Sequence, residues 1–255
     1  PEICNPWGLI HMWLSRHHIL PATGMPGTAK VRDRAMEYLS KKSMAESLRF
    51  SLQVDVPIIR DGPLSLDGSP ITRVQTRHLP GHSPGSIGLF VGREGEEKVL
   101  LCGDVLLYPI TPHPDDLLVY LQTLNYLATV DDVALVLPAH GKAVRDLQSR
   151  VRFLQQHHEQ RLMHTLDACR EPRCAWDIAT MPKYFDTYVA PDKFNYLAAK
   201  EALVHMELLS MVDALHRTQV NDHVHYFQSS GEPFDKVYGR ILGLIQDSTV
   251  SIMRY

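Results

Sequence analysis

The amino-acid sequence predicts an α/β fold followed by a smaller helical domain. Between residues 52 and 138, short apolar or alternating runs bounded by glycine and proline turns surround one segment of helical periodicity. This order of strand, loop, helix and strand implies an α/β layering with functional loops at the strand ends. From about Asp146 the chain changes to long helical stretches. We therefore expect one domain over residues 1–145 and a second over 146–255.

The expected elements follow from the spacing of apolar residues. Charged residues alternate with apolar ones over 28–50, which favours one or two amphipathic helices. Dense aliphatic runs predict buried strands, and apolar positions three or four apart predict helices. In chain order we expect short strands at 54–56, 57–59 and 71–74, strands at 87–91 and from 99, a helix at 115–128, a strand at 133–137, helices at 146–170, 174–179 and 194–217, and a hairpin at 223–227.

The composition is that of an ordinary globular protein. Of 255 residues, 44% are hydrophobic and 22% charged, and the net charge of −3 argues against a generally basic nucleic-acid binder. The four cysteines form no C-x-x-C pair, which favours free thiols in a reducing compartment over a cysteine zinc site. No signal peptide or membrane-spanning run is visible. We expect a soluble cytoplasmic protein, with the mitochondrial matrix as the alternative.

Three residues are candidates for metal chemistry. Asp104 stands within the apolar run Val99–Tyr108, where a carboxylate needs a partner or a metal. His82 lies in a glycine-flanked turn, and His140 follows a buried strand that ends in proline. Together they offer nitrogen and oxygen ligands suited to zinc, iron or manganese. Each also has a structural alternative: a turn histidine, a loop-capping acid and a strand-end histidine.

The three sequences around these residues carry a resemblance. His-Leu-Pro-Gly-His82-Ser-Pro-Gly-Ser, Leu-Leu-Cys-Gly-Asp104-Val-Leu and Val-Leu-Pro-Ala-His140-Gly resemble the last three metal-binding motifs of the metallo-β-lactamase fold hydrolases. The chain is most similar to the glyoxalase II-like and lactamase-β-like 2 branch, whose members carry a helical, winged-helix-like C-terminal extension. This resemblance implies a metallo-β-lactamase-type αββα sandwich with a winged-helix-like second domain.

The resemblance also implies a mechanism. In that family the counterpart of His82 ligates one metal, that of Asp104 bridges two metals, and that of His140 ligates the second. Two zinc ions are expected for a complete site, with iron or manganese as alternatives and no metal if the site is degenerate. Water held between the metals is the nucleophile, because coordination lowers its pKa.

One motif of the family is absent from this sequence. The signature His-x-His-x-Asp-His, which precedes the others and supplies most ligands, has no counterpart, so the N-terminal part of the sandwich is expected to be incomplete. His223 and His225 have the right step but Tyr226 and Phe227 follow, and His113 comes after Asp104. His11, His17 and His18 lie in the right half of the chain but at the wrong spacing, so they are interpreted as core or surface histidines, with substitute ligands as the alternative. Either the missing block lies upstream of Pro1 or it has been lost.

Several other polar residues have a structural interpretation that is at least as good. His78 is interpreted as a solvent-exposed strand-end histidine, with a role behind the ligands as the alternative. His157 and His158 are interpreted as a solvated helix face, and Cys102 as core. Lys142 and Arg145 could meet an anionic substrate group, although surface cations at a helix start are the simpler interpretation.

The leading functional hypothesis is a metal-dependent hydrolase of an ester, thioester or lactone. Its substrate would be a small molecule, and Asp104 would be its catalytic metal bridge. A homodimer is the expected assembly. The alternative is an inactive relative that serves as a structural or assembly subunit of an RNA-containing complex. An RNA-cleaving hydrolase is a third hypothesis, which the acidic net charge does not support.

Overall fold

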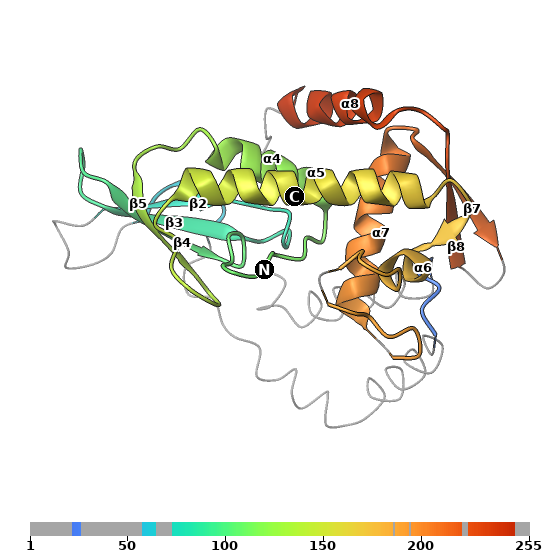
Figure 1. Ribbon diagram of the computed structural model, residues 1–255. Helices are drawn as coiled ribbons and strands as arrows, with labels where there is room; N and C mark the ends of the chain where they lie inside the picture. Colours follow the sequence, from blue (N-terminus) through green and yellow to red (C-terminus); the bar gives the residue numbers. More distant parts are fainter. Residues whose placement is uncertain are drawn as a thin grey trace. The chain divides into compact units, whose positions relative to one another are not determined.

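The computed structural model describes residues 22–26, 58–64, 73–185, 187–193, 195–220 and 224–247 (Figure 1). Two compact units divide these residues. The first combines residues 22–26 with 163–232, and the second combines 58–162 with 233–247. The domain boundary expected between residues 145 and 146 stays a prediction.

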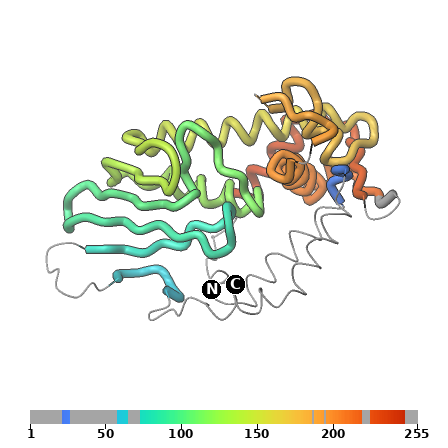
Figure 2. The backbone as a smooth tube through the Cα atoms, turned by 90° about the horizontal axis from the view of Figure 1, so that it is seen from below, coloured from blue at the N-terminus to red at the C-terminus, as the bar shows by residue number. Residues whose placement is uncertain are grey.

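A five-stranded sheet forms the second unit and confirms the expected α/β class. Its strands lie side by side in chain order, with antiparallel neighbours from β1 to β4 and a parallel pair β4–β5 (Figure 2). Because β4 and β5 are parallel, their carboxyl ends meet at the same edge of the sheet. The strands are β1 (Gly62–Leu64), β2 (Arg73–His78), β3 (Ile87–Gly92), β4 (Lys98–Gly103) and β5 (Val133–Pro138).

Helix α4 (Leu117–Leu127) makes the crossover from β4 to β5 and lies over one face of the sheet (Figure 1). The side chain of Asp116 caps the helix by accepting a hydrogen bond of 3.0 Å from the Val119 backbone N–H. The sheet residues Phe90, Leu100 and Val136 are buried, with at most 7% of each exposed. These three residues are neighbours across β3, β4 and β5 and form part of the buried core of this unit.

The first unit is mainly helical and contains a small antiparallel sheet in the order β6–β8–β7. The helix expected over 194–217 ends at Met211, because Asp213 adopts a positive φ of 57° and the chain from Leu215 pairs with β8 instead. The winged-helix character of this region stays a prediction. The elements are β6 (Arg173–Cys174), α6 (Ala175–Ala179), α7 (Tyr196–Met211), β7 (Leu215–Val220) and β8 (Val224–Ser229).

Two further helices complete the described chain. Helix α5 (Leu147–Ala168) matches the expected helix at 146–170 closely, and its residues fall in both units. Helix α8 (Phe234–Asp247) was not expected from the sequence. It packs on α4, where Gln122 Nε2 donates a hydrogen bond of 3.2 Å to the Leu244 carbonyl.

Some expectations fall outside the described residues. These are the amphipathic helices at 28–50, the strand at 54–56 and the histidines His11, His17 and His18. None of the helices in the described ranges combines the length and the hydrophobicity needed to cross a membrane. The expected compartment stays a prediction.

Candidate metal centre

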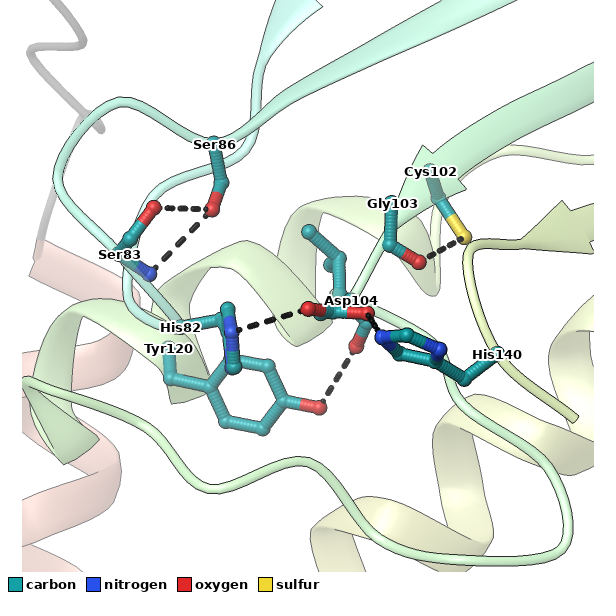
Figure 3. Close-up of polar contacts among 9 residues, drawn as sticks. His82, Ser83, Ser86, Cys102, Gly103, Asp104, Tyr120 and His140 are labelled. Carbon is teal, nitrogen blue, oxygen red and sulfur yellow. Dashed lines mark hydrogen bonds and ion pairs between the residues drawn. The ribbon is translucent and has the colours of Figure 1, made fainter. Parts of the chain in front are cut away.

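His82, Asp104 and His140 come together at the edge of the sheet where β4 and β5 end (Figure 3). Asp104 Oδ2 lies 3.5 Å from His82 Nε2, and Asp104 Oδ1 lies 3.6 Å from His140 Nε2. The side chain of His82 is 27% exposed, that of Asp104 32% and that of His140 69%. Each carboxylate oxygen therefore faces one imidazole, and the His140 side is the more open to solvent.

His82 is held by the compact turn between β2 and β3. The Leu79 N–H donates to the Ser86 carbonyl at 2.8 Å, and the hydroxyls of Ser83 and Ser86 lie 2.8 Å apart. Gly81 has a φ of 118°, a conformation that favours glycine. The chain therefore changes direction sharply just before the imidazole.

His78 supports this turn from the end of β2. Its Nε2 lies 2.6 Å from the Pro84 carbonyl oxygen, and its backbone N–H donates to Asp61 Oδ1 at 2.6 Å. Asp61 also accepts a hydrogen bond of 3.0 Å from Arg77. His78 is half-buried at the end of β2 and is tied to the loop that carries His82.

Asp104 begins the loop that leaves β4, and buried groups fix that loop at several points. The Tyr120 hydroxyl donates to the Val105 carbonyl at 2.8 Å. Arg150 is only 6% exposed; its Nε donates to the Leu107 carbonyl at 2.8 Å and its Nη2 to the Ile110 carbonyl at 2.6 Å. The bonds to the Val105 and Leu107 carbonyls are buried, and they give these carbonyls a partner away from water.

His140 lies two residues beyond the last residue of β5, close to the end of β4. The Ala139 N–H donates to the Gly103 carbonyl at 2.9 Å, and the Lys142 N–H donates to the Tyr108 carbonyl at 2.8 Å. Gly141 has a φ of 82° and contacts the Tyr108 backbone closely, so a larger residue would not fit there. The loop that carries Asp104 and the loop that carries His140 are thereby hydrogen-bonded to each other at two points, one before and one after these residues.

The electrostatic setting limits which groups could act as ligands. Burial raises the pKa of the Cys102 thiol to about 11, so this neighbour of Asp104 is a neutral thiol at physiological pH. Cys102 is fully buried, which confirms its assignment to the core. Burial also raises the pKa of the Tyr120 hydroxyl far above its usual value, and it therefore stays a hydrogen-bond donor.

The arrangement fits a cation in part. Asp104 Oδ1 is a buried atom that makes no hydrogen bond among the described residues, which is the environment that a bound cation would satisfy. The donors are two imidazole nitrogens and a carboxylate, the ligand types that zinc accepts. Within the described ranges, however, no group of three or more His, Cys, Asp or Glu side chains is arranged to hold a metal ion. The described residues thus place one histidine beside each oxygen of the Asp104 carboxylate.

Several supporting residues were not identified from the sequence. Tyr120 and Arg150 contact the loop after Asp104, and Thr123 contacts the turn before His82. In the sequence, the feature that could have pointed to this support is a tyrosine, Tyr120, on the apolar face of the expected helix at 115–128. The interpretation of His158 as solvated is wrong: it is fully buried with its ring edge-on to that of Tyr120, the centroids 5.5 Å apart.

Comparisons with solved structures support the fold. Two solved structures share the fold: a beta-lactamase domain protein from Burkholderia ambifaria (24% identity, TM-score 0.61, 73% of this chain and 55% of that one) and a metallo-beta-lactamase family protein from Thermus thermophilus (23% identity, TM-score 0.58, 83% and 67%). This chain thus spans little more than half of the Burkholderia protein. Comparison with curated proteins gave no significant match.

The decisive match is to a protein family. The family model described as "Metallo-beta-lactamase superfamily" matches residues 8–140, which is more than half of the chain and includes His82, Asp104 and His140. The chain belongs to the metallo-beta-lactamase superfamily.

Proposed function

We propose that this protein is a metal-dependent hydrolase whose metal centre includes His82, Asp104 and His140. The observation that supports it best is the position of Asp104, whose two carboxylate oxygens lie 3.5 and 3.6 Å from the Nε2 atoms of two different histidines. A carboxylate in this position can bridge two cations, with one imidazole on each. Membership of the superfamily supports metal-dependent hydrolysis in general terms.

The residues of this chain would bind the metal and orient its carboxylate ligand. His82 and His140 would hold the metal ions, with zinc expected and iron or manganese as alternatives, and Asp104 would be shared between them. The metal would supply Lewis-acid activation of water and of the scissile carbonyl. Because Tyr120 and Arg150 hold the loop after Asp104 by its carbonyls, the carboxylate is oriented before a ligand arrives.

A hydrolytic zinc site generally has three protein ligands and an open position. We therefore propose that the further ligands come from outside the described residues. The open side of the site is that of His140, whose side chain is 69% exposed. The exposed side chains of Lys142 and Arg145 follow it and could meet an anionic substrate. An ester, thioester or lactone of a small molecule remains our proposed substrate.

A second candidate function rests on one specific observation. The signature His-x-His-x-Asp-His has no counterpart in this sequence, and the second candidate is therefore an inactive relative acting as a structural or assembly subunit. RNA binding that weakens with added salt, without turnover, would support this alternative.

Metal analysis of the full-length protein tests the proposal. We expect near-stoichiometric zinc, iron or manganese by mass spectrometry, and hydrolysis of model esters, thioesters or lactones. Asp104→Ala should remove both the metal and the turnover while the protein stays folded. Asp131→Ala is the matched control, because this carboxylate is exposed and lies after α4. A full-length preparation that binds no metal would refute the hydrolase and leave the second candidate.

A further inference from the structure

Helix α4 contacts both loops of the candidate centre. At its N-terminus the Gly81 carbonyl accepts hydrogen bonds from the backbone N–H groups of Asp115 at 2.8 Å and Asp116 at 3.1 Å. Further along the helix, the Thr123 hydroxyl donates to the Pro80 carbonyl at 2.7 Å in a buried contact. The residues just before His82 are therefore attached to α4 rather than to the sheet alone.

Tyr120 joins the same helix to the other loop. Its hydroxyl donates to the carbonyl of Val105, the residue after Asp104 (Figure 3). The side chain is fully buried, and the backbone of the same residue packs directly against Gly81. A single residue thus lies against the neighbour of His82 with its main chain and against the neighbour of Asp104 with its side chain.

We propose that Tyr120 is a positioning residue that fixes Asp104 relative to His82. The bond is buried and is made by a ring with few rotatable bonds, so it restricts the Val105–Leu106 peptide. Because Val105 follows Asp104 directly, this restricts the backbone from which the Asp104 side chain projects. Groups that orient metal ligands in this way set metal affinity without touching the metal. The hydroxyl stays a neutral donor because burial raises its pKa. The expected effect of Tyr120 on metal affinity rests on the proposed function.

The test compares two Tyr→Phe variants. Tyr120→Phe removes the bond to Val105, and Tyr184→Phe removes an equally buried bond in the first unit, where the two hydroxyl oxygens of Tyr184 and Thr165 lie 2.9 Å apart. Zinc affinity is measured on the full-length protein by competition with a chromophoric chelator. Hydrogen exchange of the metal-free protein is measured for peptides that cover residues 103–108.

We expect Tyr120→Phe to weaken zinc binding by about 10–100-fold and to accelerate exchange at 103–108. Tyr184→Phe should change neither, even if both variants lose similar thermal stability. Unchanged zinc affinity and unchanged exchange in Tyr120→Phe would overturn the inference. If the wild-type protein binds no zinc, iron or manganese but Tyr120→Phe still accelerates exchange at 103–108 selectively, the proposed function fails while the positioning role stands.

Discussion

Gly81→Ala tests the close contact between the His82 turn and α4. A Cβ at residue 81 would lie 2.6 Å from Tyr120 Cβ and still closer to the Tyr120 backbone, which cannot move without shifting the helix. Forcing a non-glycine residue into this φ of 118° costs about 1–3 kcal/mol. Overpacking adds about 1–3 kcal/mol. We therefore expect a loss of about 2–6 kcal/mol, a large part of a typical domain stability of about 5–15 kcal/mol.

Two other glycines separate these contributions. Gly95 and Gly62 have φ values of 79° and 144°, on either side of that of Gly81, and a Cβ at either position would meet no atom within 4 Å. Gly95→Ala and Gly62→Ala should therefore lose only the backbone contribution of about 1–3 kcal/mol. Urea unfolding at equilibrium measures all three. If Gly81→Ala is no less stable than the two controls, the contact with Tyr120 does not constrain the turn.

The remaining predictions concern the core and the buried thiols. Leu100→Ala should lower the free energy of unfolding by about 2–5 kcal/mol, because this β4 side chain is fully buried; urea midpoints equal to wild type would contradict this. Burial raises the pKa of Cys102 to about 11 and that of Cys169 to about 12, so neither thiol should react with iodoacetamide at pH 8 until the protein unfolds, as intact-mass analysis can show. Because these pKa values are raised by folding, their contribution to stability is complete below the unfolded pKa of about 8.5 and is lost as the pH rises toward 11 and 12. Thermal unfolding between pH 8 and 11 should therefore show a falling midpoint, and a constant midpoint would argue that the thiols are not buried.

The sequence predicted the elements that carry the candidate site. The aliphatic runs at 87–91 and 133–137 correspond to β3 and β5 within a residue. These strands could be predicted because a strand that is buried on one or both faces needs apolar side chains at the buried positions. The run from Val99 ends as a strand at Gly103, after which Asp104 turns away, so only its first half is regular. Glycine and proline near His82 and His140 marked the loops where the chain turns sharply.

Long-range contacts could not be predicted in the same way. The bond from Tyr120 to Val105 and the burial of His158 depend on which helix face meets which loop, and that is set by the tertiary fold. The end of α7 was misplaced because residues 215–217 suit a helix locally, yet pairing with β8 gives their backbone groups partners in a sheet. Helix α8 was not predicted, although its apolar residues are spaced as in an amphipathic helix.

The discontinuity of the second unit has a consequence for biosynthesis. Its sheet, its site loops and α4 are all complete by Leu162, but the helix that packs on α4 is made only after Pro233. A nascent chain therefore exposes the α8-binding face of α4 while residues 163–232 of the first unit are being synthesised, a condition that favours aggregation or chaperone binding. Translation products that stop before residue 233 would keep His82, Asp104 and His140 yet lack this cover, and should be turned over faster than the finished protein.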